Sequence, residues 1–136
     1  MSQENVETVR LAYERLNSGD IDGWLQLCAT DFEFHDLPAL PGSDVRIGHD
    51  ANRAWAVEIR QEFEDLRFEP DQIIDAGDDR VVVECRVVGR GRLSGAKLDM
   101  FTFLTYNVYT LNNGTVVNGV TYDNLAEALE VAGLQA

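Results

Sequence analysis

Four strand-like segments follow one another in the second half of the chain, and short turns separate them. Runs rich in valine, threonine and aromatic residues favour strands. They cover residues 67–77, 80–92, 98–111 and 115–122. Turn signals lie between them at 77–79, at 92–97 and at Asn113–Gly114, where both residue types tolerate positive φ angles. Strands joined by tight turns pair in antiparallel fashion, so this half of the chain predicts an antiparallel sheet.

The first half of the chain carries three helical stripes, in which apolar residues recur three or four positions apart. Polar residues that accept hydrogen bonds precede each stripe, so we expect Ser2, Asp20 and Asp50 to cap these helices. Asp123 is expected to cap a short last helix that ends at Gly133. The stripes are Val6, Val9, Ala12, Tyr13 and Leu16; Ile21, Trp24, Leu25 and Cys28; and Ala51, Ala54, Trp55, Ile59, Phe63 and Leu66.

One further strand is predicted at residues 30–36, between the second and third helices. The segment 37–48 contains Pro38 and Pro41 and is expected to be a loop. Helices followed by a run of strands are typical of an α+β fold with a largely antiparallel sheet. No internal repeat or change of composition divides the chain, so we expect a single domain over residues 1–136.

The chain is strongly acidic, with a net charge of −13. Such a surface repels phosphate groups, so we expect neither a nucleic acid nor a membrane as a partner. There is no apolar run of about 18 residues that could span a bilayer. The polar N-terminal segment does not resemble a secretory signal.

Two cysteines, Cys28 and Cys85, fall at positions where the pattern expects apolar residues. Buried free thiols in a reducing cytoplasm account for them. Neither a pair of cysteines two residues apart nor a helical pair of histidines occurs, so we expect no metal site. No glycine-rich phosphate loop follows a strand and leads into a helix, so we expect no cofactor.

Asp36 ends the stretch "FEFHD", in which side chains alternate between two faces of the strand. Phe32, Phe34 and Asp36 share one face, and Glu33 and His35 share the other. Two aromatic residues mark the first face as buried, and burial of a carboxylate raises its pKa and makes it a better base. The alternative is that the strand has ended and that Asp36 caps the following turn.

The order of these segments resembles the nuclear transport factor 2-like superfamily, and within it the SnoaL-like group. The resemblance rests on residues 12–36, "IGHDANRAW", "DDRVVVECRV" and residues 107–134. It implies a cone-shaped, curved sheet wrapped around about three N-terminal helices, a central pocket and a short C-terminal helix. Members include ketosteroid isomerases and polyketide cyclases, and many form homodimers through the outer sheet face.

The resemblance also implies candidate catalytic residues. In isomerase-like members, an aspartate at the end of this strand removes a proton next to a carbonyl, and Asp36 matches it. Tyr13 and Asn107 lie within one residue of the positions of the two donors that stabilise the resulting enolate, a role described for a tyrosine and a protonated aspartic acid in ketosteroid isomerase. The structural alternatives are that Tyr13 is a core residue and that the Asn107 amide forms hydrogen bonds with backbone groups of the sheet.

The resemblance further suggests which residues surround the ligand. If some of the aromatic residues line a cavity, the ligand is apolar and cyclic, with one or two oxygens. The candidates for contact with it are Trp24, Phe34, Trp55, Phe63, Cys85 and Thr121. Cys85, Val87 and Thr121 occupy the three positions where epoxide hydrolases of this superfamily carry Arg and Asp, which excludes that activity.

Two functional hypotheses follow. The first is a cofactor-free isomerase or cyclase that abstracts a proton next to a carbonyl of an apolar cyclic substrate, with Asp36 as the base. The second is a non-catalytic domain of the same fold that binds a hydrophobic ligand or acts as a dimeric interaction module. An Asp36 that points into a turn, or a cavity filled by side chains, would favour the second hypothesis.

Overall fold

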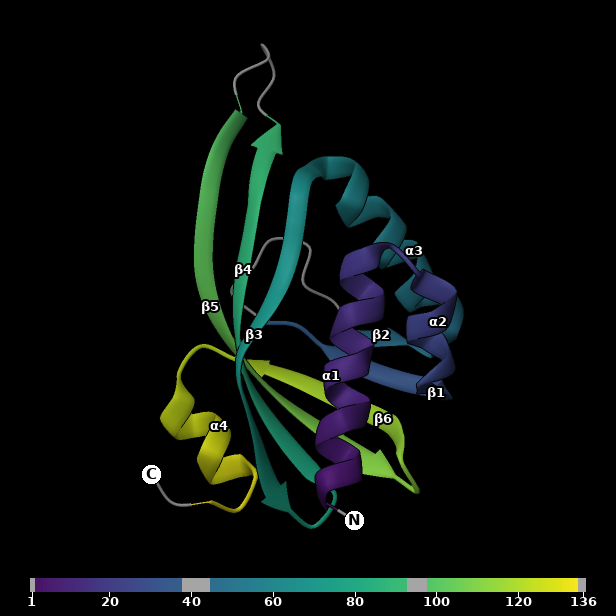
Figure 1. The fold of residues 1–136 in the computed structure, drawn as a ribbon, viewed down its shortest axis with the longest axis vertical. Helices are drawn as coiled ribbons and strands as arrows, with labels where there is room; N and C mark the ends of the chain where they lie inside the picture. Colours follow the sequence, from purple (N-terminus) through teal and green to yellow (C-terminus); the bar gives the residue numbers. More distant parts are fainter. Residues whose placement is uncertain (1, 38–44, 93–97, 135–136) are drawn as a thin grey trace.

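The structure is a computed structural model that describes residues 2–37, 45–92 and 98–134. These residues form four helices and six strands, with three helices in the first half of the chain and four consecutive strands after them, as the α+β prediction requires (Figure 1). Two expected loops, 37–48 and 92–97, lie mostly outside the described residues. The elements are α1 (Ser2–Ser18), α2 (Ile21–Gln26), β1 (Cys28–His35), β2 (Val45–Ile47), α3 (Gly48–Glu62), β3 (Phe63–Gly77), β4 (Arg80–Arg92), β5 (Leu98–Asn112), β6 (Thr115–Tyr122) and α4 (Leu125–Val131).

The six strands form one sheet in the order β2-β1-β6-β5-β4-β3. Neighbouring strands are antiparallel except for β1 and β6, which run parallel. The sheet is therefore mixed, and the expectation of a largely antiparallel sheet is confirmed. The parallel pair brings the end of β1 beside β6, so that His35 is opposite Val120 although 85 residues separate them in sequence.

The two faces of the sheet carry different helices. In Figure 1, α1, α2 and α3 lie on one side of the curved sheet and α4 lies on the other. Alternation along β4 explains this division, because Val81, Val83 and Cys85 pack with the first three helices and Val82 packs with α4. The larger core thus lies inside the curve of the sheet, where α1 contributes four of the five residues of its predicted stripe as buried side chains.

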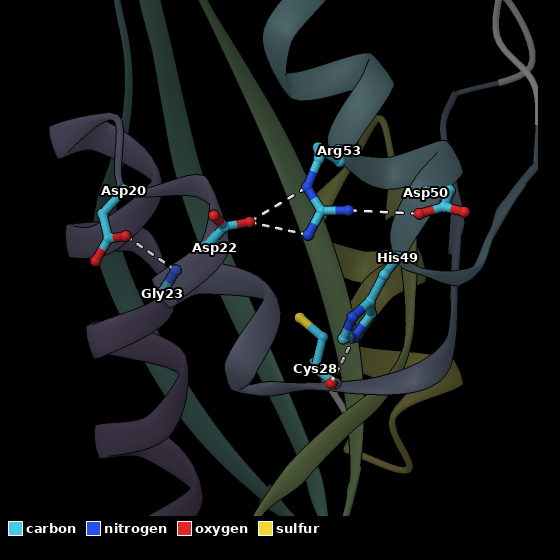
Figure 2. A network of polar contacts seen from close by, with 7 residues as sticks. All are labelled: Asp20, Asp22, Gly23, Cys28, His49, Asp50 and Arg53. Carbon is cyan, nitrogen blue, oxygen red and sulfur yellow. Dashed lines mark hydrogen bonds and ion pairs between the residues drawn. The ribbon is translucent and has the colours of Figure 1, made fainter.

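Polar contacts hold α2, α3 and the start of β1 together (Figure 2). Asp20 caps α2 as predicted, since its carboxylate accepts a hydrogen bond of 2.9 Å from the Gly23 N–H. Arg53 of α3 binds Asp22 of α2 at 2.9 Å. His49 donates from Nε2 to the Cys28 carbonyl at 3.0 Å, which fixes the first turn of α3 against β1.

Two predicted caps are wrong. Helix α3 begins at Gly48, so Asp50 lies in its first turn rather than before it, and Ile47 is the capping position without a side-chain hydrogen bond. Helix α4 is capped by Asn124, whose side-chain oxygen accepts from the Glu127 N–H at 2.7 Å, and not by Asp123. Asn and Asp are equally good capping residues, so local preference alone does not distinguish Asn124 from Asp123.

The third helical stripe is partly wrong. Phe63 and Leu66 belong to β3, because α3 ends at Glu62, and Ala54 is exposed. The buried side of α3 is instead formed by Asn52 and Ala56. The expected loop 37–48 also contains β2, which pairs with the end of β1 through three residue pairs. Short edge strands such as β2 carry too little local pattern to be recognised.

The turn predictions hold. Asn113 and Gly114 have φ angles of 52° and 77°, which are the positive values that a tight hairpin turn requires. Gly133 follows α4 with φ of 88°, its N–H bonds to Glu130, and the Leu134 N–H bonds to Leu129. This Schellman motif ends the helix where the glycine predicted it. Among the described residues, no helix is long and apolar enough to cross a membrane.

Candidate active site in the curve of the sheet

A cavity of about 520 Å³ lies between the inner face of the sheet and the three N-terminal helices. Its wall is mostly aromatic and aliphatic, with Trp24 and Trp55 from the helices and Phe32 and Phe34 from β1. Glu58 and Glu62, which also line it, are exposed and mark the side on which the cavity reaches solvent. A volume of this size holds a small organic molecule.

Alternate residues in the middle of β5 line this cavity: Phe103, Thr105, Asn107 and Tyr109. The alternation follows from the pleat of the strand, which turns these side chains to the inner face. On β6, Thr121 is opposite Asn107 and also lines the cavity. The polar side chains of the site are therefore placed by strand register, on the most rigid part of the fold.

Asp36 lies one residue beyond the end of β1, and its side chain lines the cavity. The turn interpretation is right that the strand ends at His35, whereas the pocket interpretation is right about where the side chain lies. The carboxylate oxygen Oδ2 binds the guanidinium of Arg46 on β2. Both side chains are largely buried, with 23% of Asp36 and 11% of Arg46 exposed.

Aromatic rings hold the guanidinium of Arg46 in place. Its central carbon lies 4.9 Å from the centre of the Phe34 ring and 4.2 Å from that of the Trp55 ring. Arg46 Nε also donates to Asn52 Oδ1 at 3.4 Å. A cation between two ring faces gains electrostatic energy from both. Arg46 is therefore a fixed part of the cavity wall, and the charge of Asp36 is compensated there.

A second polar group is formed by Tyr13, Tyr109 and Asn107. The two tyrosine hydroxyls are 2.7 Å apart, and Asn107 Nδ2 donates to the Tyr13 oxygen at 3.0 Å. The three residues come from α1 and β5, which are more than 90 positions apart in sequence. Asn107 is only 6% exposed, and its Oδ1 is the one buried side-chain oxygen or nitrogen of the described residues without a hydrogen-bond partner.

Burial controls the ionisation of this group. It raises the pKa of Tyr13 well above the ordinary value, and the neighbouring Tyr109 raises it further. Burial also raises the pKa of Tyr109, although its hydrogen bond with Tyr13 acts in the opposite direction. Both phenols consequently remain protonated at neutral pH, and they can donate hydrogen bonds but cannot serve as bases.

Gly119 of β6 makes room for two rings of the wall. It is opposite Phe34 on one side and Tyr109 on the other. A Cβ atom at this position would lie 2.8 Å from Phe34 Cδ2 and 2.9 Å from Tyr109 Cε1. The absence of a side chain at Gly119 therefore lets the centres of these two rings lie 6.3 Å apart. Phe34 contacts Arg46 and Tyr109 contacts Tyr13, so the two rings connect the Arg46 site with the tyrosine pair.

The structure brings together most residues predicted for the site. The exception is Cys85, which is fully buried and lies behind Tyr13 and Thr105, outside the described cavity lining. His35 pairs with Glu33 at 2.7 Å on the other face of β1, as the alternation predicts. The predicted residues that line the cavity are Asp36, Tyr13, Asn107, Trp24, Phe34, Trp55, Phe63 and Thr121.

Sequence reasoning missed Arg46 and Tyr109. Tyr109 could have been found, because it continues the two-residue period of Thr105 and Asn107 along β5. Arg46 lies in a segment expected to be a loop, and only the pairing of β2 with β1 brings it to Asp36. In the parts of the chain that the structure describes, no group of three His, Cys, Asp or Glu side chains could hold a metal ion.

The fold and the cavity define a class of α+β proteins in which helices and a curved sheet enclose an internal, mostly apolar site. Solved structures share this architecture. Bal32a, from a soil-derived mobile gene cassette, is 21% identical, with 89% of each chain covered and a TM-score of 0.76. TerC, crystallised with polyporic acid, is 19% identical over 96% of this chain and 98% of its own, with a TM-score of 0.76.

A proposed polyketide cyclase from Xanthomonas campestris pv. campestris is 24% identical over 96% of this chain and 97% of its own, with a TM-score of 0.72. No curated protein matches the sequence. The family model of the SnoaL-like domain matches residues 9–119. The chain therefore belongs to the SnoaL-like family of the nuclear transport factor 2-like superfamily, as its sequence suggested.

Proposed function

We propose that the cavity binds a small, apolar, cyclic carbonyl compound and that Asp36 removes a proton from the carbon next to the carbonyl. The observation that carries this proposal is the carboxylate of Asp36 in the wall of a mostly apolar cavity. A carboxylate so placed faces a bound substrate with little competing water. The reaction class is isomerisation or aldol-type cyclisation without a cofactor.

The proton transfer requires a free oxygen on Asp36. Among the described residues Arg46 binds Oδ2, and we assign acceptance of the proton from carbon to Oδ1. The electron pair of the broken C–H bond then forms a carbon–carbon double bond, and the carbonyl oxygen takes up negative charge. In an isomerisation the proton returns to another carbon, and in a cyclisation the nucleophilic carbon attacks a second carbonyl group.

The proposed hydrogen-bond donors for the oxygen that becomes negative lie on α1 and β5. The hydroxyl pair of Tyr13 and Tyr109 is the proposed donor, because burial keeps both phenols protonated. Asn107 donates to Tyr13 and acts on the substrate oxygen through it. This arrangement keeps all three predicted residues in the proposal and adds Tyr109 to them.

The spacing suits a fused-ring ligand. Asp36 follows His35, which is opposite Val120, and the next residue of β6, Thr121, is opposite Asn107. Asp36 and Asn107 are thus two strand spacings apart, or about 10 Å. The co-crystallisation of TerC with polyporic acid and the cyclase function proposed for the Xanthomonas protein support a cyclic oxygenated ligand.

A second candidate is non-catalytic binding of the same class of ligand. The ion pair between Asp36 and Arg46 favours it, because Arg46 already occupies one carboxylate oxygen and holds Asp36 in the cavity wall. In that case the pair holds Phe34 and Trp55 in position and takes no proton. The two candidates share the ligand and differ only in the role of Asp36.

Deuterium exchange distinguishes the two candidates. The protein would be incubated in deuterated water with fused-ring ketones and enones, and exchange at the carbon next to the carbonyl would be followed by NMR. For a catalytic Asp36, Asp36→Asn slows exchange by roughly 100-fold or more while ligand binding persists. Exchange no faster than in buffer, with binding intact, would reject catalysis and retain the binding function.

A matched control is available in Asp71→Asn. Asp71 binds Arg86 at 2.7 Å on the outer face of the sheet, so this variant also removes one carboxylate from an ion pair. It should leave both binding and exchange unchanged. Binding itself is measured by thermal shift, since a ligand at 100 times its dissociation constant adds about 2.7 kcal/mol to the free energy of unfolding.

We further propose that two copies of the chain associate through the outer face of the sheet. Leu104 on β5 is 45% exposed there and is opposite Arg86 on β4. Sedimentation velocity would show a dimer for the native chain and a monomer for Leu104→Glu. A monomeric native chain would reject this proposal.

A further inference from the structure

We infer that the ligand carries a hydroxyl group, phenolic or enolic, which donates a hydrogen bond to Asn107 Oδ1. This inference rests on the proposed binding function and narrows its ligand class from carbonyl compounds in general to those with a protic oxygen. It starts from the one buried side-chain polar atom that the described part of the protein leaves without a partner.

The amide of Asn107 is half satisfied. Its Nδ2 donates to Tyr13 at 3.0 Å, whereas its Oδ1 is shielded from solvent and accepts no bond from any described residue. A buried carbonyl without a donor is unfavourable, so its occurrence in a native structure calls for a partner from outside the described residues. Asn107 lines the cavity, and a bound molecule can supply that partner.

The neighbouring tyrosines can donate a hydrogen bond to the oxygen of the ligand's hydroxyl group. The Tyr13 oxygen accepts a hydrogen bond from Asn107. One of the two tyrosine hydroxyl hydrogens forms the hydrogen bond of 2.7 Å between the hydroxyls. When Tyr13 donates to Tyr109, the hydrogen of Tyr109 is left for an outside acceptor. The competing acceptor for Tyr13 is the sulfur of Cys85, which is weak. A hydroxyl group, which both donates and accepts, fits this end of the cavity.

The charges around the cavity favour a neutral ligand. Among its described lining residues Arg46 is the one cation, and Asp36 already binds it. Glu58 and Glu62 add negative charge at the side that reaches solvent. Burial raises the pKa of both tyrosines, which shows that this environment opposes a negative charge near them. A ligand that enters the cavity as an anion would meet the same penalty, whereas a ligand with a neutral hydroxyl group does not.

The test compares two ligands that differ by one methyl group, 2-naphthol and 2-methoxynaphthalene. Isothermal titration calorimetry on the native chain should show that the naphthol binds at least about tenfold more tightly, since the ether cannot donate to Oδ1. Equal affinities, or tighter binding of the ether, would overturn the inference. Because this comparison uses the native chain, it does not depend on the folding of a variant.

Variants assign the preference to one residue. Asn107→Leu should abolish the tenfold difference between the two ligands. Thr102→Val should retain it, because Thr102 is exposed on β5 and is not among the residues that line the cavity. A naphthol preference that persists unchanged in folded Asn107→Leu would overturn the assignment to Oδ1.

A second, independent test measures how the affinity for 4-nitrophenol depends on pH, because this ligand loses its proton near neutral pH. Its affinity should fall about tenfold for each pH unit above the ligand's own pKa, because only the neutral form can donate. Affinity that rises with ionisation would overturn the inference and indicate an anion site. Failure of every compound, including the ether and the ketones, to bind would instead overturn the proposed function together with this inference.

Discussion

Arg46 binds Asp36 in a cavity wall that contains aromatic rings. The effect of this ion pair on Asp36 distinguishes the two proposed roles of the cavity, catalysis and non-catalytic binding. The guanidinium lies over Phe34 and Trp55 and contacts the carboxylate oxygen Oδ2 of Asp36, a residue that lines the cavity. A turn aspartate would need no such partner. A carboxylate that acts as a base accepts a proton more readily when no cation is bound to it. The Asp36–Arg46 pair is therefore the first feature to change by mutation.

Replacing Arg46 with methionine should lower the free energy of unfolding by about 2 kcal/mol, because Asp36 is left partly buried without a counter-charge. In the double variant Arg46→Met/Asp36→Asn the loss should be smaller than the sum of the single losses. Urea denaturation measures all three. Arg53→Met is the control, because the Arg53–Asp22 pair is exposed and should contribute less than about 1 kcal/mol. Strict additivity would contradict the coupling.

Gly119→Ala should destabilise the protein by about 1–3 kcal/mol and weaken ligand binding. Its new methyl group would lie within 3 Å of the rings of Phe34 and Tyr109, and both rings line the cavity. Gly91→Ala is the matched strand control, since the nearest atom there is 3.9 Å away in Phe63. Thermal unfolding and naphthol titration of both variants provide the comparison. Equal behaviour of the two would show that the rings adjust freely.

The free energy of unfolding should decline at alkaline pH. Burial raises the pKa of Cys28 and of Cys85 from 9.0 to about 12. A group with a higher pKa in the folded state binds its proton more tightly there, so its contribution is complete below pH 9 and is lost as the pH rises to about 12. Each thiol can contribute about 1.4 kcal/mol per pH unit within this window.

Urea denaturation in steps from pH 8 to pH 11, with a reducing agent present, measures the alkaline decline. Cys28→Ala should give a shallower decline than the native chain, because one of the two thiols is missing. The buried tyrosines act in the same direction, since the pKa of each is raised. A free energy of unfolding that stays constant up to pH 11 would contradict the prediction.

Asn124→Ala should cost about 1 kcal/mol, because Asn124 caps α4 through its bond of 2.7 Å to the Glu127 N–H. Asp123→Ala should cost clearly less, although the sequence favours Asp123 as the cap. Amide hydrogen exchange within 125–131 reports on the helix directly. A larger effect from Asp123→Ala would reverse the assignment of the cap.

Local signals in the sequence determine much of the fold. The Asn113–Gly114 turn, the Asp20 cap and the end of α4 at Gly133 all occur where the sequence predicted them. Each depends on the conformational preference of one or two residues and on partners three or four positions away. The alternation of Phe32, Phe34 and Asp36 likewise followed from the geometry of a single strand.

The site itself was decided by tertiary structure. The register of β2 on β1 brings Arg46 to Asp36, and the packing of α1 against β5 brings Tyr13 to Tyr109 and Asn107. The sequence could nominate Asp36, Tyr13 and Asn107 singly, but it could not show that Arg46 compensates the charge of Asp36 or that one amide oxygen lacks a partner. Local preferences fix where strands and turns lie along the chain, whereas contacts between distant segments depend on strand order and sheet curvature, to which the whole chain contributes.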